Sequence, residues 1–347
     1  MKVRTKFPLR QGLSITNEDF KNAYISGQFL IDCVEITLTQ NDSEKPNVYI
    51  SKGCIQASPK GGVCARLICS RNSAESYDPM SAFWLMRGDA FVPGVLFPDS
   101  HFYQLSARDV AGNVWTHPSV DLTVEEGLEV VVLSFCCDRI QTESTVDEAR
   151  PYTYFVFLDV LEFPENTVRT TRVDSGGEFQ SESTRIEDSK GTVSGMTISY
   201  KKRKNEPGEK YSEFLAVAPS SVDASANFQD RMLESIRFCT ATMVVPVMSE
   251  TLFKNVKTIE LGKSKPLNQS GLVHAPVSTS QPETAKDFYK LFECYFLYSC
   301  VNANGKNFAP LSSKLGGLFT LKGVWLETIA LLLGVAVEGI LKEEKFK

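Results

Sequence analysis

Residues that could bind a metal or act as nucleophiles are spread thinly along the chain. The three histidines, His101, His117 and His274, are far apart, and no two of the nine cysteines have C-x-x-C spacing. A zinc site needs Cys and His ligands in close groups, and this sequence has no such group. The sequence therefore predicts no metal site, and we expect no cofactor.

The cysteines mostly lie inside apolar runs, as in Ile68-Cys69 and Phe135-Cys136. Buried cysteines that stay reduced are typical of proteins in reducing compartments. The first residues also lack the apolar core of a secretory signal. We therefore expect reduced thiols and a cytoplasmic location. Cys136 and Cys137 are adjacent, so in a strand they would point to opposite faces.

No complete catalytic motif is present. The serine of Gly191-Thr-Val-Ser194-Gly195 is one place late for a nucleophile elbow, and no H-E-x-x-H pattern occurs. Glu327 and Glu338 are spaced for one helical face, but three turns separate them by about 16 Å, too far for most paired-carboxylate mechanisms. An enzymatic activity is therefore not predicted by any motif in the chain.

One dense basic run could form a charged surface. It consists of Lys201, Lys202, Arg203 and Lys204, and the turn residues that follow place it beside a hairpin. The net charge of the chain is −5, and no arginine follows Arg237. Because arginine is favoured for phosphate recognition, this distribution argues against broad nucleic-acid binding and leaves RNA as a secondary alternative.

The order of local patterns predicts the elements that would position these residues. Residues 28–217 contain short β-type runs broken by turn residues, with strands expected at 29–38, 63–69, 128–136 and 152–160. Gly112 and Asn113 tolerate positive φ and predict a hairpin turn. Residues 166–195 are polar and fit a long loop or a hairpin pair. We expect residues 1–219 to form an antiparallel β-rich domain, either a sandwich or a barrel.

A helical period replaces the β pattern after residue 220. Phe228, Met232, Ile236 and Cys239 fall on one helical face. Residues 280–283 read as a capping box, and a second apolar stripe follows it. This second stripe consists of Phe288, Leu291, Phe292 and Tyr295. We therefore expect an α+β protein with a helical C-terminal domain over residues 220–347.

The most apolar segment of the chain covers residues 324–341. It is nearly long enough to span a bilayer, but Glu327 and Glu338 interrupt it, and buried carboxylates are costly in lipid. We expect a buried or interface helix rather than a membrane span. Its candidate interface residues are Trp325, Leu332, Val335 and Glu338.

This last segment, read from Trp325 to Leu341, resembles a helix of HEPN-type proteins from bacterial anti-phage abortive-infection systems. In the ApeA-like members a β-rich domain precedes the helical bundle, and the layout here is similar. The family's ribonuclease motif is an arginine followed closely by a histidine, which no histidine of this chain satisfies, and the chain stops at Lys347. The resemblance implies a defence protein whose helical domain is incomplete.

Three functional hypotheses follow from these observations. The first is a sensor or recognition protein of a bacterial defence system, whose β domain binds a ligand or phage component and whose helices dock an effector or self-associate. The second is a HEPN-like ribonuclease with an incomplete or composite active site. The third is a stand-alone β-sandwich that binds carbohydrate or protein. We expect a protein partner or self-association through the C-terminal helix, and no membrane.

Overall fold

The computed structural model describes residues 18–25, 28–57, 62–70, 99–126, 130–147, 151–158, 167–174, 177–186, 194–203, 211–217, 228–262, 276–277, 285–302, 308–312 and 315. The chain divides into two compact units. Unit 1 comprises Met1–Glu143 and Glu260–Lys265, and unit 2 comprises Ser144–Ile259 and Pro266–Lys347.

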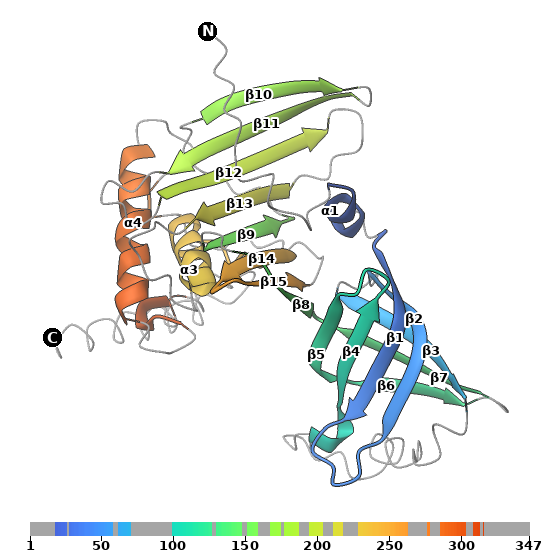
Figure 1. Ribbon diagram of the computed structural model, residues 1–347. Coiled ribbons are helices and arrows are strands. Elements are labelled where there is room, and N and C mark those ends of the chain that lie inside the picture. The colour runs from blue at the N-terminus through green and yellow to red at the C-terminus, as the bar shows by residue number, and fades with distance from the viewer. Residues whose placement is uncertain are drawn as a thin grey trace, which may run out of the picture. The chain divides into compact units, whose positions relative to one another are not determined.

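Unit 1 is an antiparallel β structure with one short helix before its first strand (Figure 1). The elements are α1 (Glu18–Ile25), β1 (Leu30–Gln40), β2 (Val48–Ala57), β3 (Val63–Ser70), η3 (Asp99–His101), β4 (Tyr103–Asp109), β5 (Val114–Val120), β6 (Leu122–Glu126), β7 (Val130–Cys137) and β8 (Ile140–Thr145). Two meanders make up the sheet, the first from β1 to β3 and the second from β4 to β7. The end of β8 passes into unit 2.

The strands of unit 1 form a closed ring. β1 pairs with both β2 and β4, β2 pairs with β3, and β3 pairs with β7. β7 pairs with β6, while β5 pairs with β4. Only Asp121 separates β5 from β6, so these two act as one bent strand that closes the ring. Closure removes the sheet edges that would otherwise invite aggregation.

The bent strand belongs to one long hairpin. Leu122 lies opposite Phe135 in the β6–β7 ladder, and Trp115 lies opposite Thr142 in the β5–β8 ladder. Both ladders share a single register, so β5–β6 and β7–β8 are two halves of the same strand pair. The β6–β7 half of this pair belongs to the ring. In the other half β8 pairs with β5, and the end of β8 passes into unit 2.

The interior of the ring is apolar because side chains alternate along each strand. In β4 every second residue is buried, from Tyr103 to Asp109, and the residues between them are exposed. Fully buried side chains come from both meanders and fill the ring. They are Ile36, Leu38, Ile55, Val63, Leu67, Leu105, Ala107 and Leu133.

Across its described residues, unit 2 contains an antiparallel sheet and two long helices. Its strands are β9 (Tyr152–Phe157), β10 (Thr167–Asp174), β11 (Gly177–Ile186), β12 (Ser194–Arg203), β13 (Tyr211–Val217), β14 (Met248–Phe253) and β15 (Val256–Leu261), whose last two residues count with unit 1. The helices are α3 (Phe228–Thr240) and α4 (Ala285–Asn302). The strand order is β10-β11-β12-β13-β9-β14-β15.

The helices and the central strands of unit 2 share one core. Phe155 and Phe157 of β9 pack in the same cluster as Met232 and Ile236 of α3 and Phe292 of α4. Every residue of β9 is buried, which fits a central strand covered on both faces. The aromatic rings of Phe238 and Tyr295 stack between the helices, with their centroids 3.8 Å apart.

The structure confirms several elements that the sequence predicted. The N-terminal part is antiparallel and β-rich, the predicted apolar stripe of α3 is buried, and residues 166–195 contain hairpin strands. Gly112 has the expected positive φ of 89°, but Asn113 does not. Residues 248–261 form the β14–β15 hairpin inside the region that we expected to be a helical domain. The boundary predicted after residue 219 falls within unit 2, between β13 and α3.

Among the helices within the described ranges, none is both long and apolar enough to cross a membrane.

Candidate functional site

The outer face of the first meander and β7 carries side chains that are unusual for a solvated sheet. The residues that point outward here are every second residue of three neighbouring strands. We call this set the outer face; it consists of Ile50, Lys52 and Cys54 of β2, Cys64, Arg66 and Ile68 of β3, and Val132, Ser134 and Cys136 of β7. The residues between them point into the ring and are mostly buried.

Two large apolar side chains of the outer face are exposed to solvent. Ile50 is 58% exposed and Ile68 is 63% exposed. The β2–β3 ladder ends with Gly53 opposite Leu67, and the same register extended by one residue places Lys52 beside Ile68. The strands stay close there, because the Ser51 hydroxyl donates a hydrogen bond to the Ile68 carbonyl at 2.9 Å. Ile50 is therefore a diagonal neighbour of Ile68, within reach of side-chain contact. Exposed apolar side chains that gather in this way are typical of interaction surfaces.

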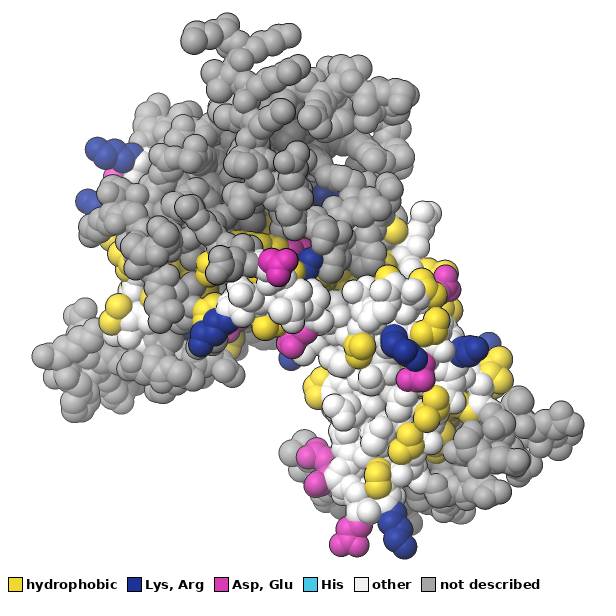
Figure 2. All heavy atoms as spheres, viewed as in Figure 1, with side chains coloured by type: hydrophobic (Ala, Val, Ile, Leu, Met, Phe, Trp, Pro, Cys, Tyr) yellow, Lys and Arg dark blue, Asp and Glu magenta, His cyan; other side chains and the backbone are white. Residues whose placement is uncertain are grey.

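A third apolar residue extends the row. Val132 lies directly opposite Ile68 in the β3–β7 ladder and is partly exposed. The row thus crosses β3 and β7 directly and reaches β2 at the diagonal position of Ile50. Figure 2 shows hydrophobic side chains at several places on the visible surface of unit 1.

The charged members of the outer face are both basic. Lys52 and Arg66 are exposed, and each lies two residues from an apolar member of the row on its own strand. A partner with an apolar centre and acidic groups around it would match this surface in shape and charge.

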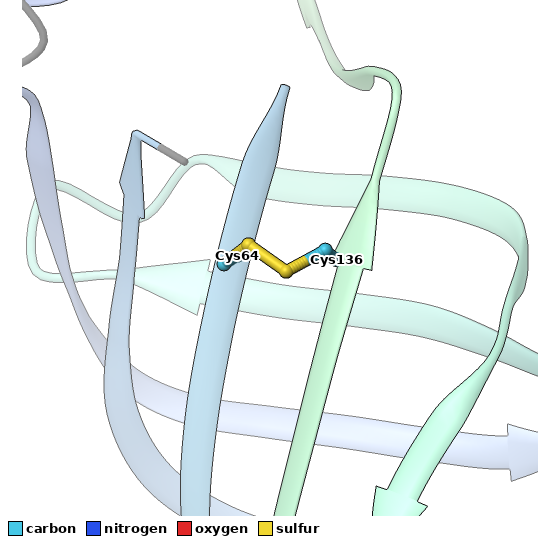
Figure 3. The surroundings of a disulfide bond; sticks show 2 residues. All are labelled: Cys64 and Cys136. Atoms are coloured by element: carbon cyan, nitrogen blue, oxygen red, sulfur yellow. A yellow bond between two sulfur atoms is a disulfide. The ribbon is translucent and has the colours of Figure 1, made fainter. Parts of the chain in front are cut away.

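A disulfide crosses the outer face. Cys64 and Cys136 lie directly opposite each other on β3 and β7 and are bonded, with their Cα atoms 4.1 Å apart (Figure 3). The expectation that all cysteines are reduced and buried is therefore wrong for this pair. It failed because the two residues are 72 positions apart, so only strand pairing brings them together. Exposed disulfides are typical of oxidising compartments, so the cysteines no longer support a cytoplasmic location.

Seven cysteines are free, and they differ in exposure. The structure buries four of them, Cys33, Cys69, Cys137 and Cys239, as expected. Cys54 is partly exposed, and Cys294 and Cys300 are exposed on α4. Cys137 is buried next to the more exposed Cys136, so the two neighbours do point to opposite faces.

Unit 2 contains a buried ion pair within α3, and its carboxylate also binds the chain that follows α4. Arg231 Nη1 lies 2.8 Å from Glu234 Oε1, and both side chains are almost completely buried. The Glu234 carboxylate also accepts hydrogen bonds from the Ala309 backbone N–H, 3.2 Å away, and from the Ser312 hydroxyl. Burial raises the pKa of Glu234, although the Ser312 hydrogen bond and the Arg231 charge act against that rise.

A second buried carboxyl lies in the sheet of unit 2. Glu250 of β14 is 1% exposed and accepts a hydrogen bond from the Tyr152 hydroxyl. Burial raises the pKa of Glu250, and the charge of buried Lys257 works in the opposite direction. Both carboxyls are sealed from solvent, so they hold elements together rather than meet a substrate.

Three strand aromatics and one histidine also have defined surroundings. Trp115, Tyr103 and Tyr152 are buried in their strands, so they belong to the cores. His117 lies in β5, and its Nδ1 accepts a hydrogen bond from the Ser119 backbone N–H at 3.1 Å. Within the described residues, no group of three or more Cys, His, Asp or Glu side chains is placed to hold a metal ion.

Of the other predicted site residues, three lie within the described residues and five do not. Lys201, Lys202 and Arg203 end strand β12, which pairs with β13 as the expected hairpin. Lys204 lies outside the described residues. So do the four interface candidates of the last apolar segment, Trp325, Leu332, Val335 and Glu338.

The outer face was not predicted from the sequence. Ile50 and Ile68 each follow a buried residue, Tyr49 and Leu67, so apolar residues occupy both faces of their strands. Two adjacent apolar residues in an otherwise alternating strand are the signal that would have identified them.

Comparison with known proteins adds no relative. No protein family, curated protein or solved structure matches the chain.

Proposed function

We propose that this chain is a recognition protein that binds a protein partner on the outer face of unit 1. The observation that carries the proposal is the exposed pair Ile50 and Ile68, which are neighbours on paired strands. The partner is a protein with an apolar centre and acidic groups near it, because the exposed basic residues Lys52 and Arg66 each lie two positions from a member of the pair on its own strand.

The sequence resemblance gives this proposal its biological setting. In that setting the chain is a sensor of a bacterial anti-phage system, unit 1 binds a phage protein, and the C-terminal helices dock an effector or a second copy. A cytoplasmic location belongs to the same proposal. The helical part of the proposal rests on Trp325, Leu332, Val335 and Glu338, the candidate interface residues of the apolar segment.

Site-specific photo-crosslinking tests the binding surface. A benzophenone amino acid replaces Ile68 in the full chain, which is expressed in bacteria with and without phage infection, and adducts are identified by mass spectrometry. The matched control places the same probe at Val110, which is 72% exposed but lies in the β4–β5 turn. We expect a phage-protein adduct at position 68 in infected cells only.

Each outcome bears on a separate part of the proposal. An adduct at position 68 with a host protein, in both cell samples, would keep the binding surface and reject the phage trigger. No adduct at position 68, or equal adducts at 68 and 110, would reject the outer face as the binding surface.

The helical part has its own test. Leu332→Asp combined with Val335→Asp is expected to reduce the solution mass of the protein measured by light scattering, because charged side chains oppose burial at an interface. An unchanged mass would contradict the proposal that the protein self-associates through this segment.

A further inference from the structure

Three cysteines of the outer face lie on three neighbouring strands. Cys54 is on β2, Cys64 is on β3 and Cys136 is on β7. Cys64 and Cys136 form the disulfide, and Cys54 is free and partly exposed. All three belong to the alternate positions that point outward, so their sulfur atoms share one side of the sheet.

The strand register places the free thiol close to the disulfide. Gln56 lies opposite Cys64, and Cys54 lies opposite Arg66. Cys54 is therefore the diagonal neighbour of Cys64, a relationship that separates Cα atoms by about 7–8 Å. Disulfides commonly span Cα distances of up to about 6.8 Å, so a shift of about 1 Å brings Cys54 within bonding range.

The remaining free thiols of unit 1 cannot compete for this disulfide. Cys33, Cys69 and Cys137 point into the ring and are buried. Burial raises the pKa of Cys33 to about 11 and that of Cys137 to about 12, and it also raises the pKa of Cys69. Thiols that are protonated and enclosed do not attack disulfides.

We propose that Cys54 and the Cys64–Cys136 disulfide form a thiol–disulfide exchange site. The Cys54 thiol loses its proton to solvent, and the thiolate attacks Sγ of Cys64. A Cys54–Cys64 bond forms as the Cys64–Cys136 bond breaks, and Cys136 leaves as a thiolate that takes up a proton. One disulfide and one thiol are present before and after, so no oxidant or reductant is consumed.

The exchange changes what the disulfide holds. The Cys64–Cys136 bond links the two meanders, which the chain connects only over a long sequence distance. A Cys54–Cys64 bond would link only β2 and β3, which are already neighbours in one meander. The more exposed Cys136 then becomes the free thiol at the β3–β7 junction, where it can react with a thiol or disulfide of another molecule.

Disulfide mapping tests the site on the full chain. The oxidised protein is incubated at about pH 8.5, where thiolates are well populated, then denatured in acid, blocked with N-ethylmaleimide and digested with trypsin. Lys60 lies between Cys54 and Cys64, and Arg66 follows Cys64, so the three cysteines fall in separate peptides. We expect a Cys54–Cys64 linked peptide to appear together with blocked Cys136.

Two variants control the assignment. In Cys54→Ser protein the Cys64–Cys136 link should persist and Cys136 should stay unblocked, whereas Cys294→Ser protein, which loses an exposed thiol of α4, should behave like the wild type. In Cys136→Ser protein, oxidised glutathione should produce the Cys54–Cys64 link directly.

Several results would overturn the proposal. One is a wild-type protein whose only linkage is Cys64–Cys136 at all times. Another is blocking of Cys136 to the same extent in Cys54→Ser protein, and a third is a starting protein with no Cys64–Cys136 link. None of these outcomes depends on whether the outer face binds a partner, so this experiment tests the exchange site independently of the proposed function.

Discussion

Trp115 donates its indole N–H to the carboxylate of Asp109 over 3.0 Å, and both residues are buried at the β4–β5 turn. The same carboxylate accepts hydrogen bonds from the backbone N–H groups of Ala111 and Asn113 and from the Asn113 side chain. One acidic side chain therefore fixes the turn and ties it to the core tryptophan.

Asp109→Ala should strongly destabilise unit 1. The substitution removes all four hydrogen bonds and leaves the buried Trp115 N–H without this acceptor, so we expect the free energy of unfolding to fall by about 3 kcal/mol. Urea denaturation measures the change. Asp99→Ala, at an exposed position of η3, is the control and should change stability by less than about 0.5 kcal/mol. Equal effects of the two substitutions would contradict the role of Asp109.

The Asp109 carboxylate also predicts a dependence on pH. Burial alone would raise the pKa of Asp109, but the hydrogen bonds outweigh it and hold the pKa below its usual range. A lowered pKa in the folded state means that its contribution is present above about pH 3.9, the unfolded value, and is lost as the pH falls through the folded pKa. Asp109→Asn should therefore reduce the loss of stability between about pH 4 and pH 2. An unchanged acid profile would argue against this assignment.

Glu234→Ala should destabilise unit 2. Removing this carboxylate leaves the guanidinium of Arg231 buried without its ion-pair partner and deprives Ala309 and Ser312 of their acceptor, so we expect a loss of about 3–5 kcal/mol. Thermal unfolding followed by circular dichroism measures it. Lys290→Ala, at an exposed position of α4, serves as the control. A small effect of Glu234→Ala would mean that the ion pair contributes little to packing of the helices.

Leu67 and Ile68 offer a direct test of the strand orientation of β3. Leu67 is fully buried inside the ring, and Ile68 is 63% exposed on the outer face. Leu67→Ala should lower the free energy of unfolding by about 3 kcal/mol, whereas Ile68→Ala should lower it by less than about 1 kcal/mol. Denaturant titration of both variants makes the comparison, and the reverse order would mean that β3 is turned by one residue.

Gly62 and Gly112 both have positive φ, but their surroundings differ. A Cβ on Gly62 would lie against the backbone carbonyl of Cys137, whereas a Cβ on Gly112 would meet nothing within 4 Å. Gly112→Ala should cost only the backbone term of about 1–2 kcal/mol. Gly62→Ala should cost clearly more, because the β3–β7 junction must also move. Similar melting temperatures for the two variants would contradict this difference.

Local periodicity was sufficient to locate many elements. The alternation after Phe29 identified β1, and the helical spacing of Met232 and Ile236 identified the buried face of α3. Both patterns arise from geometry within a single element, where each side chain's direction follows from the backbone repeat. The turn at Gly112 was likewise predictable, because positive φ favours glycine wherever it occurs.

The candidate sites depended instead on contacts between distant parts of the chain. Ring closure brings β3 against β7, and only that pairing places Cys64 opposite Cys136 and Val132 beside Ile68. Strand register is set by the packing of the whole ring, since a shift by one residue would turn every buried side chain outward. The composition and periodicity of the chain thus determined its β-rich character and its main elements, while tertiary pairing decided which cysteines bond and which apolar residues stay exposed.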